Sequence, residues 1–566
     1  MADNIEVLYR DSRAPEDPEV KWRGFQPGRT VLAAGSTHSP EGRPLACDIV
    51  LDRDVEMRLS DGTRIFLDVY RPDTDEPLPA VLAWSPYEKQ GGFVEYDVFP
   101  GRGGVAPSAT SGLEKFEGPD PAFWCANGYA VVHVDPRGSF ASEGDVQVFS
   151  PLEAQDGHDV VEWVAAQDWC ADAVAMAGNS WLAVTQWMIA ATRPPHLAAI
   201  APWEGFTDVY RDYVRWGGIL RLGLAETLTV MNAGRGRIED LPGMARKYPL
   251  MNDYWRSKIT DVEAVAVPAY VVASWTNSLH TRGTLEAFTR LDPSRSWLRV
   301  HNTMEWPDQY AYEDDLLAFF DHVIKGKDNG WQRTPRVRLS VLDPGGTDQV
   351  DRPEDGYPLA RARETALHLD AGRNRLSASP PSEETHADYQ AETGTLTFDH
   401  VIDRDIEIVG PMKLRVWLEV DTGTDASLFV YVRKADADGQ PLLSEVFEGM
   451  PCLGAHGRLR ASHRELDPDL STALSPVCAH EREQPLRPGE AVQMDIAVWP
   501  HGMALHAGER LQVVISGHDL EPELAALEAD APAQNSGTHR IHTGGAFDSH
   551  LLVPIVTAEE AEAPAL

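Results

Sequence analysis

The sequence predicts an α/β domain built on a parallel sheet, followed by an all-β domain. Up to about residue 334, short apolar runs alternate with stretches of helical spacing, which is typical of a parallel sheet covered on both faces. After Pro335 the pattern changes to many short strands and turns, which favours a β-sandwich or jelly roll. The stretch 208–262 interrupts the alternation with helical composition and many aromatic residues.

Composition limits the classes of function. The chain has 566 residues, of which 43% are hydrophobic and 24% charged, as is ordinary for a globular protein of several domains. A net charge of −38 argues against binding to phosphate backbones or anionic membranes, so we expect no nucleic-acid or membrane partner. The five cysteines are scattered without a CxxC pair, and no His/Cys/acid pattern has metal-ligand spacing, so no metal is predicted.

The first elements of the α/β domain follow from alternation and turn signals. Residues 55–59 and 64–70 alternate on either side of an Asp-Gly turn, which predicts a β-hairpin. The apolar runs 79–83 and 130–134 indicate buried parallel strands. Between the second of these and the next strand, residues 155–167 have helical spacing with an apolar face.

The stretch 174–183 is the centre of the predicted domain. A buried strand ends at Gly178, a helix begins at Trp181, and Ser180 lies between them. A serine in a strand-to-helix turn, two residues after a glycine, is the signature of a nucleophile elbow. The backbone N–H of Trp181, at a helix N-terminus, could then donate to an oxyanion. A serine that caps an ordinary helix is the alternative, and Leu182 stands where the common motif has glycine.

The flanking motifs strengthen the first interpretation. Asp135-Pro136-Arg137-Gly138-Ser139, the stretch 153–163 and the elbow follow one another in an order that resembles the CocE/NonD hydrolases and the Xaa-Pro dipeptidyl-peptidase (S15) family. The resemblance extends from about residue 55 to residue 556. Trp181 and Ala183 stand where the family has tyrosine and glycine. The resemblance implies an α/β-hydrolase domain, an inserted helical cap and a C-terminal jelly roll.

This gives a division of the chain. We expect an N-terminal extension of unassigned role at 1–50, the α/β-hydrolase domain at 51–207 and 263–335, the cap at 208–262, the jelly roll at 336–556 and a disordered tail at 557–566. A cap inserted after a central strand would cover the carboxyl ends of the strands, where open α/β sheets bind ligands. Tyr210, Tyr213 and Trp216 are therefore predicted to line the substrate pocket, unless the insert is peripheral and they are only core.

The resemblance also implies the remaining site residues and shows where this chain departs. In the family a tyrosine after an early strand is the second oxyanion donor, and Tyr87 matches it. The position of the family's aspartate is occupied by Asn277, and that of its histidine by Glu305. His301 and His280 are the alternative bases near these positions.

Three interpretations of the catalytic residues follow. In the first, His301 takes the proton of Ser180 and is oriented by Asn277 or Glu305. In the second, Glu305 is itself the base, which requires a raised pKa in a desolvated site. In the third, the chain has kept the fold without the hydrolytic triad and binds a ligand, or does non-hydrolytic chemistry, beneath the cap.

The sequence thus predicts a serine hydrolase that cleaves an ester or amide bond of a small substrate, an acyl ester or an Xaa-Pro-type peptide, through an acyl-enzyme at Ser180. No cofactor is expected, and a homo-oligomer is compatible with the sequence. A binding module in the C-terminal domain is a further alternative. The N-terminus lacks the apolar segment of a signal peptide, and no run of about 20 apolar residues occurs, so we expect a cytoplasmic protein.

Overall fold

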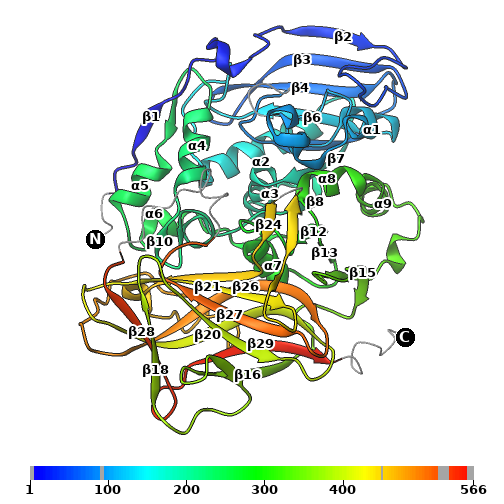
Figure 1. Ribbon diagram of the computed structural model, residues 1–566. Coiled ribbons are helices and arrows are strands. Elements are labelled where there is room, and N and C mark those ends of the chain that lie inside the picture. The colour runs from blue at the N-terminus through cyan, green and yellow to red at the C-terminus, as the bar shows by residue number, and fades with distance from the viewer. Residues whose placement is uncertain (1–4, 90–94, 448–449, 521–534, 558–566) are drawn as a thin grey trace.

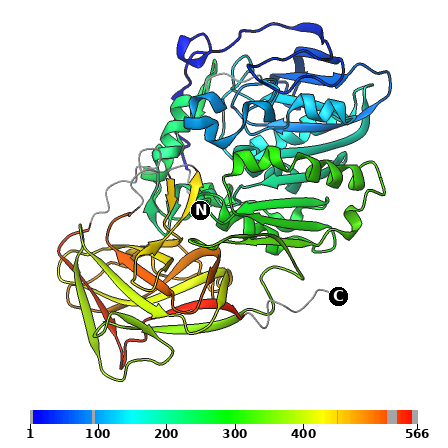
Figure 2. The ribbon, with the colours of Figure 1, turned by 45° about the vertical axis from the view of Figure 1, so that its right-hand side comes forward.

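The computed structural model describes residues 5–89, 95–447, 450–520 and 535–557, and it places an α/β domain above a strand-rich C-terminal domain (Figures 1 and 2). The chain after residue 335 is rich in strands, as predicted, but its first two strands, Val337–Val341 and Gln349–Glu354, still belong to the sheet of the α/β domain, so the C-terminal domain starts later than predicted. Within the described ranges, each helix is too short or too polar to cross a bilayer. The predicted disordered tail lies outside these ranges, except for Thr557, which ends the last strand.

One sheet of eleven strands organises the α/β domain. Its order is β15-β14-β13-β12-β8-β7-β5-β6-β4-β3-β2, and the strands from β14 to β6 are parallel. The strands are β2 (Gly28–Leu32), β3 (Ile49–Arg58), β4 (Arg64–Pro72), β5 (Leu78–Trp84), β6 (Ala130–Asp135), β7 (Cys170–Asn179), β8 (Leu197–Trp203), β12 (Ala269–Ser274), β13 (Ser296–His301), β14 (Val337–Val341) and β15 (Gln349–Glu354).

Helices connect the parallel strands and cover the sheet. They are α1 (Pro121–Ala126), α2 (Pro151–Ala165), α3 (Trp181–Ala191), α7 (Thr281–Arg290), α8 (Glu305–Ala311) and α9 (Glu313–Val323). Ten consecutive residues of α3, from Trp181 to Ala190, are buried, because α3 is packed between the sheet and α2. Gly157 of α2 permits this close approach, since a Cβ there would lie 2.1 Å from Cδ1 of Ile189.

The insert between β8 and β12 mixes short helices and strands. It contains a π-helical turn (Val209–Val214), β9 (Arg215–Trp216), β10 (Ile219–Leu220), α4 (Gly223–Met231), β11 (Arg237–Glu239), α5 (Leu241–Lys247) and α6 (Asp253–Arg256). The first 50 residues, for which the sequence predicted no role, contribute one strand to the insert and one to the large sheet. β1 (Tyr9–Asp11) pairs with β11 of the insert, and β2 pairs with β3 at the edge of the large sheet.

The C-terminal domain is a single hydrogen-bonded path of strands that closes on itself. β29, at one end of the path, pairs with β16 and also with β20, which closes the strands from β20 to β29 into a ring and leaves β28 and β18 outside it. The strands are β16 (Arg363–Asp370), β17 (Arg375–Ser377), β18 (Thr385–Gln390), β19 (Thr395–Val401), β20 (Ile406–Val420), β21 (Ser427–Ala435), β22 (Pro441–Leu442), β25 (Ala455–Arg460), β26 (Val492–Leu505), β27 (Arg510–Ser516), β28 (Thr538–Thr543) and β29 (His550–Thr557). A separate hairpin, β23 (Ser444–Phe447) and β24 (Met450–Cys452), extends toward the α/β domain (Figure 1).

A buried ion pair behind the sheet edge gives a stability prediction. Arg299 of β13 is fully buried, donates to Asp308 Oδ1 at 3.0 Å and lies 3.7 Å from the centre of the Tyr312 ring. Asp308→Ala would leave the guanidinium buried without its carboxylate, so we expect the free energy of unfolding to fall by about 3–5 kcal/mol. Urea denaturation measures this loss.

The matched control is the exposed pair of Arg256 and Glu481, whose atoms are 2.7 Å apart with side chains 48% and 63% exposed. Glu481→Ala should change the free energy of unfolding by about 1 kcal/mol or less, because solvent screens such pairs. Equal losses in the two variants would contradict the prediction.

Candidate active site

Ser180 occupies a strained turn between β7 and α3. Its backbone has φ 56° and ψ −119°, a left-handed conformation that residues other than glycine rarely adopt. Gly178 has φ +130°, and a Cβ there would lie 2.7 Å from the carbonyl oxygen of Glu117. Close backbone approach at the glycine and strain at the serine are the geometry of a nucleophile elbow. Ser180 is half-buried and lines a cavity.

Three main-chain carbonyls hold this turn, and each belongs to a glutamate. The Asn179 N–H donates to the carbonyl of Glu117 at 3.1 Å, and the Ser180 N–H donates to that of Glu204 at 2.9 Å. The Asn179 side chain donates through Nδ2 to the carbonyl of Glu305 at 3.2 Å. The glutamates come from the loop before α1, the end of β8 and the start of α8. The turn therefore fixes three acidic residues around the serine.

The cavity that Ser180 lines has a volume of about 240 Å³ and is mostly apolar. Tyr87, Glu117, Asn277, His280 and Glu305 are polar side chains in its wall. The α/β domain, helix α4 of the insert and the hairpin β23–β24 contribute the apolar side chains, which are Phe99, Phe116, Leu224, Leu228, Met231, Leu279, Met304, Trp306, Val446 and Met450.

Both predicted oxyanion donors flank the serine. Tyr87 and Ser180 line the same cavity, and the Ser180 side chain lowers the pKa of Tyr87 in opposition to burial. The Tyr87 ring is held edge-on against Phe116 and Trp181, with centroids 5.5 and 6.1 Å away. Trp181 is the first residue of α3, so its backbone N–H has no acceptor within the helix. A phenolic O–H and a helix N-terminal N–H are thus positioned beside one hydroxyl.

Two buried carboxyl groups meet next to the cavity. The carboxyl groups of Glu204 and Glu305 lie close together, because both accept from Nδ2 of Asn277. Burial raises the pKa of Glu204 to about 8. Burial, and then the neighbouring charge of Glu204, raise the pKa of Glu305 well above its usual range. Two carboxyls in contact cannot both ionise readily, so this pair holds at least one proton at neutral pH and titrates as a unit.

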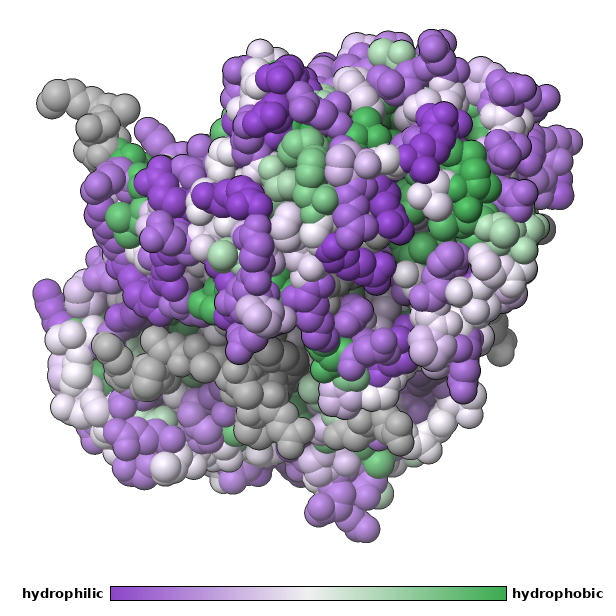
Figure 3. Space-filling view, turned by 90° about the horizontal axis from the view of Figure 1, so that it is seen from above, coloured by the Kyte–Doolittle hydropathy of each residue, from purple (hydrophilic) through white to green (hydrophobic). Residues whose placement is uncertain are grey.

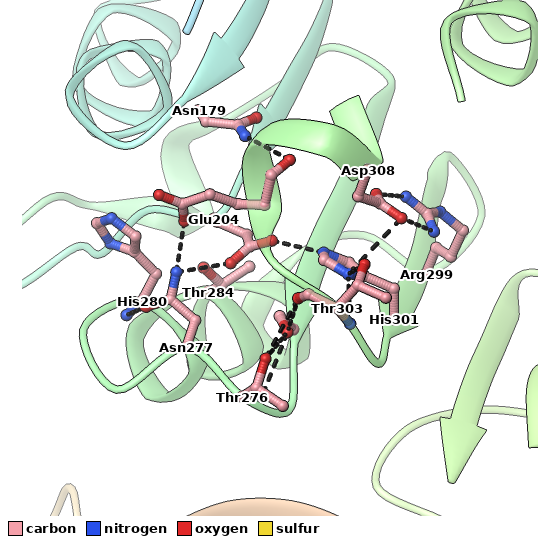
Figure 4. A network of polar contacts seen from close by, with 12 residues as sticks. Asn179, Glu204, Thr276, Asn277, His280, Thr284, Arg299, His301, Thr303 and Asp308 are labelled. Carbon is pink, nitrogen blue, oxygen red and sulfur yellow. Dashed lines mark hydrogen bonds and ion pairs between the residues drawn. The ribbon is translucent and has the colours of Figure 1, made fainter. Parts of the chain in front are cut away.

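Asn277 joins the two carboxyls (Figure 4). Its Nδ2 donates to Oε2 of Glu204 at 2.7 Å and to Oε2 of Glu305. Its Oδ1 accepts from the backbone N–H groups of Leu279 and His280 at 2.9 and 3.0 Å, so the amide can present only its NH₂ to the acids. These donations lower the pKa of both carboxyls, in opposition to burial.

His301 lies behind Glu204 rather than among the residues that line the cavity. Its Nε2 is 2.5 Å from Oε1 of Glu204, and its Nδ1 faces Thr303 Oγ1 at 3.3 Å and Asp308 at 3.6 Å (Figure 4). Burial lowers the pKa of His301 to about 4, so the imidazole is neutral. The expectation that His301 reaches Ser180 directly does not fit this geometry, because the two ring nitrogens face Glu204 and Asp308.

His280, the other candidate base, does line the cavity. It is 2% exposed and stacks on Phe206, with ring centroids 5.9 Å apart. Burial and then the charge of Arg221 lower its pKa to about 3.

The aromatic residues predicted to line the pocket are not among those that line this cavity. Tyr210 donates to the carbonyl of Pro249 at 2.6 Å, and Tyr213 stacks on Phe206 with centroids 5.4 Å apart. Trp216 packs against Trp499 of the C-terminal domain at 3.9 Å. These rings form the core of the insert and its contact with β26, while the apolar side chains of α4 line the cavity instead.

Sequence reasoning missed Glu117 and Glu204. Glu204 directly follows a buried strand, at the sheet edge where ligand-binding groups gather, and this was a usable signal. Glu117 lies in a loop with no pattern to mark it. It is 3% exposed, accepts from Nε1 of Trp306 at 2.9 Å, and has a pKa raised by burial and then by Glu305.

A parallel sheet with a serine at a strand-to-helix elbow, and oxyanion donors beside it, defines an α/β-hydrolase. The protein-family model for X-Pro dipeptidyl-peptidases (S15 family) matches residues 61–242 of this chain. That of the X-Pro dipeptidyl-peptidase C-terminal non-catalytic domain matches residues 329–552. A CocE/NonD family hydrolase from Staphylococcus aureus is 33% identical and superimposes with a TM-score of 0.85, over 90% of this chain and 94% of that one. The chain belongs to the CocE/NonD hydrolase family.

Other relatives are more distant. The cocaine esterase of Rhodococcus sp. is 26% identical over 600 residues, which cover 89% of this chain and 98% of the esterase. An aminopeptidase from a Thaumarchaeota archaeon shares the fold with a TM-score of 0.69 at 15% identity, over 90% of this chain and 97% of the aminopeptidase.

The carboxyl pair predicts how stability depends on pH. The pKa of Glu204 is about 8 in the folded protein, against an ordinary value of 4.5. The folded state therefore retains a proton that the unfolded state releases, and the free energy of unfolding falls as the pH rises from about 5 to about 8. Glu204→Gln removes the contribution of Glu204. The slope of the free energy of unfolding against pH should therefore be smaller in this variant, by up to about 1.4 kcal/mol per pH unit.

Urea denaturation at pH 5, 6.5 and 8 measures the slopes. Glu481→Gln, at an exposed position, should parallel the wild type. If Glu204→Gln also does so, the raised pKa of Glu204 is refuted.

Proposed function

We propose that this chain hydrolyses an ester or amide bond of a small, largely apolar substrate and that Ser180 forms the acyl-enzyme. The observation that carries the proposal is the strained Ser180, which lines an apolar cavity of about 240 Å³ together with Tyr87. The names of the relatives, an esterase and an aminopeptidase, support both bond types. A cavity of this size and composition favours an apolar acyl group.

In this mechanism Ser180 Oγ attacks the substrate carbonyl carbon. The carbonyl oxygen becomes an oxyanion and lies between the Tyr87 hydroxyl and the Trp181 N–H. Preorganised donors of this kind stabilise the tetrahedral intermediate more than the ground state. Collapse of the intermediate breaks the bond to the alcohol or amine, and water then attacks the acyl-enzyme through a second intermediate of the same kind.

We assign the proton transfer to Glu305 in its ionised form. It accepts the proton as Ser180 Oγ bonds to carbon, and it returns that proton to the leaving alkoxide or amine. Glu305 stands where the family pattern has histidine, lines the cavity with Ser180, and is oriented by Asn277. Its raised pKa makes the carboxylate a stronger base than an exposed glutamate but reduces its ionised fraction at neutral pH.

A second candidate is a non-hydrolytic or ligand-binding role. The observation in its favour is the shared proton of Glu204 and Glu305, because a protonated pair at neutral pH can donate a hydrogen bond to a ligand. This candidate requires no activated serine, which separates it from the first.

We also propose that the C-terminal domain is a jelly roll whose first strand is β16, because β14 and β15 still belong to the sheet of the α/β domain. Its long antiparallel strands and the pairing of β29 with both β16 and β20 support this topology.

The nucleophile is tested by Ser180→Ala. We expect the variant to lose labelling by a fluorophosphonate and to lower kcat for a chromogenic acyl ester by about 10³-fold or more, because the attacking atom is removed. Ser278→Ala is the matched control, since Ser278 lines the same cavity outside the elbow. It should label like the wild type. Labelling of Ser180→Ala at the wild-type rate, or the absence of labelling in the wild type, would refute the acyl-enzyme.

The base is tested by pH profiles of kcat/KM. The wild-type rate should rise with pH, because only the ionised carboxyl accepts a proton, and Glu305→Gln should lose this rising limb. Asn277→Ala should shift the limb to higher pH, since the lost donor had lowered the pKa of both acids. If His301 is the base instead, Glu305→Gln keeps the limb and His301→Ala loses it. Ester turnover in none of these proteins would favour the non-hydrolytic role.

A further inference from the structure

Two histidines and an aspartate converge at the junction of β16 and β29 in the C-terminal domain. His368 and His550 are directly opposite each other in the antiparallel ladder, so their side chains project from the same face of the sheet. Asp548 precedes β29 by two residues, and its carboxylate lies beside both imidazole rings. The fold thus places three potential metal ligands together, in a domain that contributes none of the polar residues around Ser180.

The ligand atoms have separations that suit a metal ion. Nδ1 of His368 and Nδ1 of His550 are each 3.2 Å from the same oxygen, Oδ1 of Asp548. All three atoms lie within 4.8 Å of one another. In a tetrahedral zinc site with bonds of about 2.0–2.1 Å, neighbouring ligand atoms are about 3.3 Å apart. The two distances from a histidine nitrogen to Asp548 Oδ1 therefore already match the separation of neighbouring ligand atoms in a zinc site.

The hydrogen bonding of the cluster points independently to a missing ligand. His550 is hydrogen-bonded to Asp548 through Nδ1. Nδ1 of His368 is buried and makes no hydrogen bond of acceptable geometry, although it faces the same carboxylate oxygen. A buried ring nitrogen without a partner costs free energy, which a bound cation would recover. The Asp548 side chain is 52% exposed, so the site is open to solvent for entry of an ion and for a water as fourth ligand.

We propose that His368, Asp548 and His550 bind a divalent first-row transition metal, with Zn²⁺ as the reference ion. Two imidazoles and one carboxylate suit Zn²⁺, Ni²⁺ or Cu²⁺ and do not suit Mg²⁺ or Ca²⁺, which prefer oxygen ligands. Arg415, the residue opposite His550 on β20, is paired with Asp495 at 2.7 Å, which offsets its repulsion of a cation.

The position of the site gives it a structural role. Along the chain, β16 is the first strand of the C-terminal domain and β29 is the last. β29 pairs with β16 and also with β20. An ion bound to both strands therefore joins the two ends of the domain. Because the unfolded chain does not hold these ligands together, the metal stabilises the folded state in proportion to its occupancy.

The test uses the full-length protein without a histidine tag, freed of metal with a chelator. Isothermal titration with ZnCl₂ should give one site per chain, and Zn²⁺ should raise the melting temperature of the wild type. Co²⁺ in place of Zn²⁺ should give the visible absorption of a four-coordinate site. Asp548→Asn removes an exposed ligand with little effect on packing, and it should weaken Zn²⁺ binding by about tenfold or more, as His368→Ala should.

The matched control is the second cross-strand histidine pair of the domain, His386 and His542, whose ring centroids are 5.8 Å apart, against 5.7 Å for His368 and His550. The acidic residues beside this pair already have hydrogen-bond partners. Glu419 is bonded to His542 at 2.8 Å, and Asp388 accepts from Arg540 at 2.9 Å. His386→Ala should keep wild-type Zn²⁺ binding. The proposal is overturned if wild type and Asp548→Asn bind Zn²⁺ equally, if neither binds, or if His386→Ala loses the site as well.

Discussion

The strained turn at Ser180 is the constraint on which the rest of the site depends. A non-glycine residue in this conformation costs about 1–3 kcal/mol and persists only when its surroundings fix it. Here the backbone of Asn179 and Ser180 and the Asn179 amide donate to the carbonyls of Glu117, Glu204 and Glu305. The bonds that hold the serine in place thus tie it to the main chain of three glutamates, which brings these acidic residues to the same turn.

Asn277 and Glu305 are complementary in hydrogen bonding. In a Ser-His-Asp arrangement the acid accepts a hydrogen bond from the histidine. Here the direction is reversed, because the Asn277 amide donates to Glu305 and Glu204. Aspartate at position 277 would add a third acceptor to two buried carboxyls, while histidine at 305 would face an NH₂ group. Aspartate at 277 alone would place an acceptor against other acceptors, and histidine at 305 alone would place an N–H donor against the NH₂ group. The residue at each position is therefore compatible with the residue at the other.

The sequence predicted most of the frame because its signals are local. The runs 79–83 and 130–134 lie within β5 and β6, and the Gly178 turn fixed the place of Ser180. Helix α2 begins at Pro151, four residues before the predicted start, because Ser150 caps it. The site was predictable only in part. Whether Tyr210 lines a pocket or fills a core depends on packing between distant segments, and no period marks the loop of Glu117.

The cavity is a property of both domains. Val446 and Met450 belong to the hairpin of the C-terminal domain, yet they line the same cavity as Ser180. The two domains are also joined by backbone hydrogen bonds between Leu342 and the segment 502–504, and a Cβ at Gly502 would lie 2.6 Å from Nε1 of Trp275. Trp275 follows β12 and is two residues before Asn277, so the contact that locks the domains together lies beside the segment that orients the acids. The C-terminal domain therefore completes the site, which a separate binding module would not do.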